Sequence, residues 1–327
     1  MLNSFKNSWL ILASIHRLFF KHPVLVLPII FGWLIYAYTI IYFRFKFDWA
    51  HYSNDQNYLI VFMIILFFST IISISNLVVL ELIQQIESGK PTSIIKSISD
   101  AFTQNFIRAF PIILTWAILW FIIAVIQAFT SGKKKSNEKD SNADELNTKN
   151  MAIELANVQE FSFSLLMFNA IKKGFRMMAF TMFPAIAWED DSTMNAVKKG
   201  FVIVKNRWAE FATGFILTSA LNRLIFFPVS LFLAFAKDEK NIPDQVWTYL
   251  LFYIALGWSY SIYLEMLFTA ELYLWDMNWR KACKRAESEG RKRPEFHEVK
   301  RPSIMDDTND MKNIIIKNWN TKTPNKE

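Results

Sequence analysis

The chain is divided into continuous apolar runs, each close to the ~20 residues of a membrane-spanning helix, with charged segments between them. A soluble core requires apolar residues that recur with the period of a helix or a strand, whereas a bilayer requires continuous runs. Apolar residues make up 53% of the 327 residues, and Phe alone contributes 31. We therefore expect an all-α fold, a polytopic membrane helix bundle.

Six runs are long enough to cross a bilayer. The expected spans cover residues 24–43, 58–83, 110–129, 161–188, 210–236 and 246–275, within a bundle over residues 1–275. Residues 131–160 have too few apolar side chains to fold alone, so a flexible polar loop is expected there. Residues 276–327 are basic. We expect a helical extension of the last span to residue 290 and then a largely disordered tail.

Three amphipathic helices, over residues 2–20, 92–109 and 193–208, each precede a span and carry apolar residues at three- and four-residue spacing. The first either lies on the membrane surface or packs on the bundle, because both arrangements bury the same face. The third has an apolar stripe of Met194, Val197, Phe201, Val204 and Trp208 and the basic residues Lys198, Lys199, Lys205 and Arg207. We expect these cations and Trp208 at the lipid headgroups; the alternative is an ordinary solvated face.

The distribution of Lys and Arg predicts the orientation of the chain. Six spans put both termini on one side of the membrane, and the segments on that side carry most of the Lys and Arg outside the spans. Because cytoplasmic loops are enriched in these residues, both termini and all three amphipathic helices are expected at the cytoplasmic face. The run Lys133-Lys134-Lys135 on the other side is the exception.

Charged and amide residues interrupt three of the expected spans. Asn169, Lys172, Lys173 and Arg176 lie within 161–188, Asn222 and Arg223 within 210–236, and Glu265 within 246–275. A Lys or Arg at the bilayer centre costs roughly 2.5–3.5 kcal/mol on insertion scales, so we expect these seven residues to form one buried charge cluster. The helical rise puts Arg176, Arg223 and Glu265 at comparable depths, which predicts an ion pair of Glu265 with Arg223 or Arg176.

This charge cluster has three interpretations. It is a structural ion pair that fixes the register of the helices, or it is a pocket for an anion or a lipid headgroup. In the third interpretation the span over 161–188 is wrong: its first half lies on the membrane surface, and Met177–Trp188 is re-entrant.

The sequence offers no motif for catalysis or metal binding. The four His residues make no pair with metal-ligand spacing, and the single cysteine, Cys283, excludes an intrachain disulfide and a CxxC site. No Gly-x-Ser-x-Gly motif is present. We expect no catalytic residue, no metal and no cofactor. The basic tail lacks interleaved aromatic residues, so no nucleic-acid partner is expected.

Two short patterns carry a resemblance to a known family. NSWLIL and HPVLVLPII lie within residues 7–30, and FPAIAWEDDSTMNAVKKGFVIVKNRW covers residues 183–208. Together they resemble an uncharacterised bacterial family of six-span membrane proteins, a domain-of-unknown-function family. More distantly, they are similar to the membrane domain found beside glycerophosphodiester phosphodiesterases. The resemblance implies a bacterial inner-membrane protein and supplies no catalytic residue, and residues 131–160 and the tail depart from it.

The sequence favours a non-enzymatic membrane protein, a scaffold or accessory subunit that contacts membrane lipids at the cytoplasmic leaflet. It is expected to bind either a different protein or a second copy of the same chain. The alternative is a small transporter or channel for an anionic solute or lipid that uses the cationic cluster. A water-filled cavity reaching Arg176 and Arg223 would favour transport, whereas a dry, paired core would favour the scaffold.

Overall fold

The computed structural model describes residues 2–87, 91–131, 163–236 and 242–299. The described residues form helices and their connections and contain no β-strand, so the prediction of an all-α helix bundle is confirmed. The expected loop over 131–160, apart from Ser131, and the part of the expected tail beyond residue 299 lie outside the described residues.

The described residues form α-helices of different lengths. They are α1 (Leu2–Lys21), α2 (Leu27–Phe45), α3 (Asn54–Glu87), α4 (Ile94–Asp100), α5 (Phe106–Ser131), α7 (Phe163–Phe180), α8 (Phe183–Glu189), α9 (Thr193–Asn206), α10 (Trp208–Ala236) and α11 (Asp244–Ser288). Shorter elements are η1 (Pro23–Val26), η2 (Trp49–His51) and η4 (Phe296–Glu298), which are 3-10 helices, and η3 (Ala101–Asn105), which is a π-helical turn.

Among the described residues, five helical segments are long and apolar enough to cross a membrane. They are Pro23–Phe45, Asn54–Ile86, Ile94–Ile126, Trp208–Ala236 and Asp244–Ser288. Five of the expected spans therefore correspond to apolar helices, and the chain is a multi-pass membrane protein. Large apolar side chains point outward along these helices, as in Tyr38, Leu59 and Leu224, which is what contact with lipid requires.

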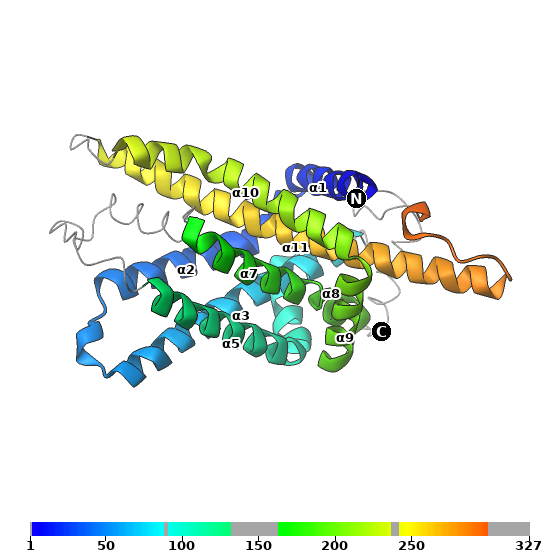
Figure 1. The fold of residues 1–327 in the computed structure, drawn as a ribbon, viewed down its shortest axis with the longest axis horizontal. Helices are drawn as coiled ribbons and strands as arrows, with labels where there is room; N and C mark the ends of the chain where they lie inside the picture. Colours follow the sequence, from blue (N-terminus) through cyan, green and yellow to red (C-terminus); the bar gives the residue numbers. More distant parts are fainter. Residues whose placement is uncertain (1, 88–90, 132–162, 237–241, 300–327) are drawn as a thin grey trace.

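The helix α11 is the element around which much of the bundle packs. Its 45 residues extend about 68 Å at the α-helical rise, and α10, α2, α1 and α7 all contact it. The loop 46–53 lies at one end of the bundle, which we call the distal end (Figure 1). The helices α8 and α9 lie at the other, proximal end, and α11 continues beyond them.

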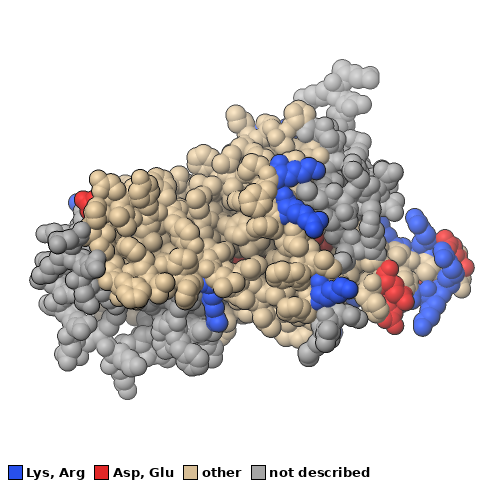
Figure 2. All heavy atoms as spheres, turned by 90° about the horizontal axis from the view of Figure 1, so that it is seen from above, with Lys and Arg blue, Asp and Glu red and all other residues tan. Residues whose placement is uncertain are grey.

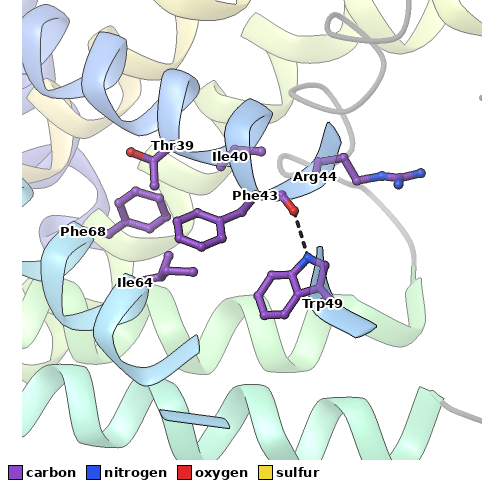
Figure 3. A pocket seen from close by; sticks show the side chains of 7 residues that line it. All are labelled: Thr39, Ile40, Phe43, Arg44, Trp49, Ile64 and Phe68. Atoms are coloured by element: carbon purple, nitrogen blue, oxygen red, sulfur yellow. Dashed lines mark hydrogen bonds between the residues drawn. The ribbon is translucent and has the colours of Figure 1, made fainter. Parts of the chain in front are cut away.

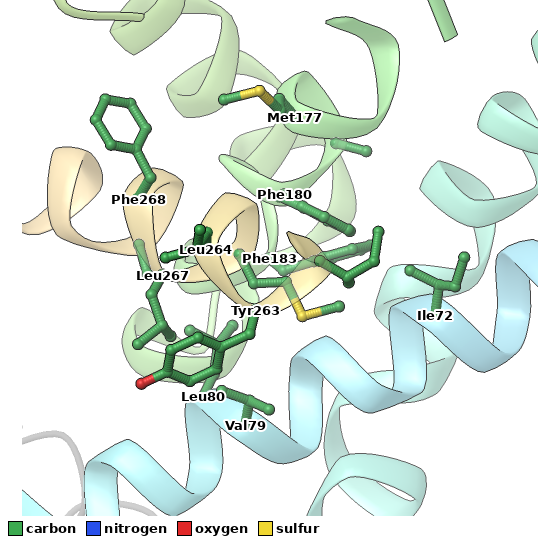
Figure 4. Packing of buried hydrophobic residues seen from close by; sticks show 14 of the residues in the cluster. Ile72, Val79, Leu80, Met177, Phe180, Phe183, Tyr263, Leu264, Leu267 and Phe268 are labelled. Atoms are coloured by element: carbon green, nitrogen blue, oxygen red, sulfur yellow. The ribbon is translucent and has the colours of Figure 1, made fainter. Parts of the chain in front are cut away.

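Bulky side chains fill the centre of the bundle where α3, α7, α8 and α11 meet. The buried residues include Ile72, Val79, Leu80, Phe180, Phe183, Tyr263, Leu264 and Leu267 (Figure 4). The indole Nε1 of Trp188 donates a hydrogen bond to the backbone carbonyl oxygen of Leu80 over 3.2 Å. Since this bond joins α8 to α3, it fixes the position of the chain just after α7.

The remaining expected span, over 161–188, is not one continuous helix. The helix α7 ends at Phe180, a turn follows at Thr181 and Met182, and α8 begins at Phe183. The physical reason is Pro184, which lacks an N–H and whose ring clashes with the carbonyl four residues earlier, that of Phe180. The 18 residues of α7 still extend about 27 Å and run antiparallel to α5, back toward the proximal end (Figure 1).

The structure has no break at residue 110, where the boundary between the amphipathic helix over 92–109 and a span is expected. The elements α4, η3 and α5 follow one another directly, and Pro111 lies inside α5. Ser97, Ala101 and Asn105 face the bundle, and the amide Nδ2 of Asn105 donates to Oε1 of Glu81 over 2.7 Å. The outward side of this segment carries the apolar residues Ile95 and Phe102 together with the polar residues Lys96 and Gln104.

The first helix packs on the bundle, which decides between the two alternatives for residues 2–20. Ile11, Leu12, Ile15 and Leu18 are buried against neighbouring helices. The hydroxyls of Ser8 and Thr213 lie 2.7 Å apart, which joins α1 to the first turns of α10. The N-terminal part of α1 is therefore fixed at the proximal end.

The chain beyond α11 folds back on it, so the expectation of a disordered tail is wrong for residues 291–299. The helical extension is confirmed, since α11 continues to Ser288. Two indole groups then hold the returning chain: Nε1 of Trp279 donates to the carbonyl of Pro294 over 3.0 Å, and Nε1 of Trp275 donates to that of Val299 over 3.1 Å.

Candidate functional site

An ion pair between α7 and α11 lies inside the bundle. The guanidinium of Arg176 binds the carboxylate of Glu265 through two nitrogens, with Nε 2.8 Å from Oε2 and Nη2 3.0 Å from Oε1. Glu265 is 1% exposed, so its charge depends on these contacts. Of the two predicted partners of Glu265, the structure selects Arg176.

Lys173 extends this pair to a third helix. Its Nζ lies 3.3 Å from Oε1 of Glu265 and donates to the hydroxyl of Ser219 on α10 over 2.8 Å. The same ammonium lies 5.2 Å from the centroid of the Phe215 ring, within the range of a cation–π interaction. Lys173, Arg176 and Glu265 therefore connect α7, α10 and α11.

Arg223 does not join this cluster, in contrast to the prediction. It is exposed on α10, and no hydrogen bond or ion pair joins it to the part of the chain that the structure describes. The neighbouring Asn222 has its Oδ1 buried without a hydrogen-bond partner among the described atoms. Lys172 is partly buried on α7, and the side chain of Asn169 lies outside the described part.

A second buried ion pair holds the proximal end, and it corrects the prediction for Arg207. This side chain is 8% exposed, and its Nε lies 3.0 Å from Oδ1 of Asp276 on α11. Its Cζ lies 4.1 Å from the ring centroid of Trp279 and 3.5 Å from that of Phe296. Arg207 is thus held between two aromatic rings and is not available to lipid headgroups.

The position of Arg207 between two helices explains why the prediction for it was wrong. α9 ends at Asn206 and α10 begins at Trp208, so Arg207 occupies a helix boundary with φ −115° and ψ 32°. A residue between two helices need not continue the face of either one. Asp276, Trp279 and Phe296 escaped sequence reasoning because they were assigned to the extension and tail of the last span.

Lys199 likewise binds acids of its own chain. Its Nζ lies 2.6 Å from Oε2 of Glu189 and 2.5 Å from Oδ2 of Asp191. The other oxygen of Glu189 accepts a hydrogen bond from the hydroxyl of Tyr273 on α11. Partial burial disfavours the charged ammonium, but the hydrogen bonds to Asp191 and Glu189 outweigh it and raise the pKa of Lys199. This cation closes the turn between α8 and α9, so its expected place at the headgroups is not found.

The outward side of α9 and of the start of α10 combines apolar and basic side chains. We call the set Met194, Lys198, Phe201, Lys205 and Trp208 the α9 surface. Trp208 is 66% exposed and Phe201 52% exposed, and both Lys residues are exposed beside them. The opposite side of α9 packs on the bundle through Ala196, Gly200 and Ile203. Lys198, Lys205 and Trp208 are therefore accessible, as a membrane-surface role requires.

Charged side chains are unevenly distributed over the molecule. Figure 2 views the bundle from the side on which α1 and α10 lie. One half of this view is a broad, largely uncharged surface, and acidic and basic side chains gather at the end where α11 extends beyond the bundle. Such a division is typical of a protein with an apolar belt in the membrane and a charged part outside it.

An apolar cavity of about 320 Å³ lies near the distal end, between α2 and α3 (Figure 3). Its lining consists of Thr39, Ile40, Phe43, Arg44, Trp49, Ile64 and Phe68. The indole Nε1 of Trp49 donates to the carbonyl of Phe43 over 2.8 Å and so holds the loop beside the cavity. None of the buried charged residues on α7, α10 and α11 lines this cavity, so it gives no path to them.

The arrangement is suited to holding helices together rather than to chemistry. The buried cations Lys173 and Arg207 and the partly buried Arg176 are each bound to a carboxylate of another helix. Within the described residues, no group of three or more His, Cys, Asp or Glu side chains is placed to hold a metal ion. Among the predicted site residues, Lys198, Lys205, Trp208 and Arg223 are exposed.

Comparison with known proteins adds no further assignment. The resemblance carried by residues 7–30 and 183–208 stays a prediction. The chain matches no family model, no curated protein and no solved structure.

Proposed function

We propose that this chain is a non-catalytic membrane protein, a scaffold or accessory subunit that contacts lipid and partner proteins at its proximal end. The observation that carries the proposal is the α9 surface. Exposed Met194, Phe201 and Trp208 suit the boundary between headgroups and acyl chains. Lys198 and Lys205 beside them attract anionic headgroups.

The pairing of the buried charges supports a structural role for them. A transporter of anions needs cations that its solute can reach, and Arg176 instead makes two hydrogen bonds to a carboxylate that is 1% exposed. Breaking that pair to admit a solute leaves a buried charge uncompensated. Helix register is therefore the better account of the Arg176–Glu265 pair.

We also propose a bacterial inner-membrane location with both termini in the cytoplasm. The N-terminal part of α1 and the end of α11 lie toward the same end of the bundle (Figure 1). This supports an even number of membrane crossings, namely the five apolar helices together with α7. Single cysteines at Ser53 and Ser288, in a Cys283→Ser background, test the orientation with a membrane-impermeant maleimide on spheroplasts. Labelling of Ser53→Cys alone before lysis is expected, and the reverse pattern contradicts the orientation.

Purification in a mild detergent tests the function. Identification of the bound protein and lipid from the wild-type chain should give a reproducible protein partner and anionic phospholipid. In Lys198→Glu/Lys205→Glu the bound anionic lipid should decrease, because each cation near an anionic surface contributes about 1 kcal/mol. The matched variant Lys198→Arg/Lys205→Arg keeps the charge and should retain the lipid.

Two results contradict the proposal. One is a wild-type chain that retains neither protein nor anionic lipid. The other is anion flux through liposomes containing the purified chain, provided that Arg176→Met abolishes the flux while the protein stays folded. That second result supports the transporter instead.

A further inference from the structure

Arg223 is a charged residue on the outer surface of a membrane-spanning helix. It lies near the middle of α10, which runs from Trp208 to Ala236. At the helical rise, these two ends are about 22 Å and about 20 Å away along the axis. The side chain is exposed, so it faces the surroundings of the bundle and not its interior. At this depth a guanidinium is costly unless an anion or water compensates it.

The surface around Arg223 is apolar. Ile216, Leu224 and Phe227 are each at least 60% exposed, and they lie within two turns of Arg223 on α10. Ala220 and Ser230 are also exposed and leave room for another helix to approach closely. We call Ile216, Ala220, Arg223, Phe227 and Ser230 the Arg223 face. Helical geometry puts all five on one side of α10.

No carboxylate of the described chain can neutralise Arg223. The nearest charged cluster contains Glu265, which is 1% exposed and already bound by Arg176 and Lys173. With two cations and one carboxylate, this cluster carries a net positive charge and does not attract Arg223. The charge therefore has to be compensated from outside the described chain.

A second copy of the chain does not provide that compensation. In a two-fold contact through this face, Arg223 would meet Arg223, because both subunits present the same patch. Three carboxylates within the described spanning helices, those of Glu81, Glu265 and Glu271, are each at most 2% exposed and cannot reach a neighbour. Lipid phosphates lie at the bilayer surfaces, far from the middle of α10.

We propose that the Arg223 face binds a transmembrane helix of a partner protein that carries an Asp or Glu near the middle of its span. The carboxylate forms an ion pair with the guanidinium of Arg223, and the small residues Ala220 and Ser230 allow the two helices to pack. This inference rests on the proposed function as an accessory subunit and names the class of partner.

Photo-crosslinking of the full chain in native membranes tests the inference. A benzoylphenylalanine replaces Phe227, one turn from Arg223, and the crosslinked peptide is sequenced by mass spectrometry. The expected product is a membrane-spanning peptide of another protein with a central Asp or Glu. Its yield should fall about tenfold or more in Arg223→Met and stay high in Arg223→Lys. Replacing the partner's acid by Lys should restore the crosslink to Arg223→Glu.

The controls separate this inference from the proposed function. The same crosslinker at Phe252, an exposed residue on α11, should give products that Arg223→Met does not change. Crosslinks from residue 227 to lipid alone, to a second copy, or to a peptide without a central acid overturn the inference. A crosslinking yield that stays the same in Arg223→Met also overturns the inference. In that case the proposed function still stands if a partner protein co-purifies. If wild type retains neither a protein partner nor anionic lipid in detergent, the proposed function fails as well.

Discussion

The ion pair between Arg176 and Glu265 yields the sharpest test of how the bundle is held together. Glu265→Gln keeps the shape of the side chain and removes its charge. Arg176 and Lys173 then remain close to each other without the carboxylate that binds both. Because removing one partner of a buried ion pair typically costs about 3–5 kcal/mol, we expect Glu265→Gln to lower the free energy of unfolding by that amount.

The variant of the other partner, Arg176→Met, should lower the free energy of unfolding by less. In Arg176→Met the carboxylate of Glu265 keeps Lys173 at 3.3 Å, so the loss is closer to that of hydrogen bonds to a charged group, about 1.5–3 kcal/mol. The double variant should lose less than the sum of the two, with a coupling energy of about 0.5–3 kcal/mol.

Reversible unfolding in mixed detergent micelles, followed by far-ultraviolet circular dichroism, measures these free energies. Arg223→Met is the matched control, because it makes the same substitution at an exposed Arg without a bond to the described chain. Its effect should stay within about 0.5 kcal/mol. Additive losses in the double variant, or a control as costly as Arg176→Met, would refute the assignment of the pair as a structural link.

Two further predictions concern packing at other positions. Arg207→Met should remove the cation between its two aromatic rings and leave Asp276 with one fewer partner. Amide hydrogen exchange over residues 289–299 should therefore accelerate. The control Lys205→Met, at an exposed site, should leave this exchange unchanged. Gly214→Ala should lower the melting temperature in detergent, because the added methyl overlaps the ring of Phe268 and overpacking costs about 1–3 kcal/mol. Gly174→Ala, whose added methyl meets nothing within 4 Å, should leave the melting temperature unchanged. Equal effects of the two Gly variants, or unchanged hydrogen exchange in Arg207→Met, would contradict the packing described above.

The spans could be located from the sequence because hydropathy is a local property. A run such as 210–236 is apolar whatever it packs against, and a bilayer imposes its length. The structure accordingly contains α10 over Trp208–Ala236. The run 161–188 is not one continuous helix for a reason that is also local, since Pro184 lies just beyond the end of α7 at Phe180.

The site was only partly predictable, because helical periodicity defines the sides of one helix and not which neighbour each side meets. The sequence predicted Glu265 as the carboxylate of the cluster and either Arg176 or Arg223, at similar depth, as its partner. The choice of Arg176 over Arg223 depends on the rotation of α7 and α10 about their axes, which packing sets.

The sequence by itself determined that this chain is an all-α membrane protein, since continuous apolar runs leave few other folds open. It also determined the composition of α9, with its apolar stripe and its cations. Only the tertiary structure decided which of those cations are exposed on the surface of the protein. Arg207 is buried by a segment almost ninety residues later in the chain, Phe296, whereas Lys198 and Lys205 stay exposed. Such contacts between distant segments depend on the packing of the whole bundle, and no local pattern records them.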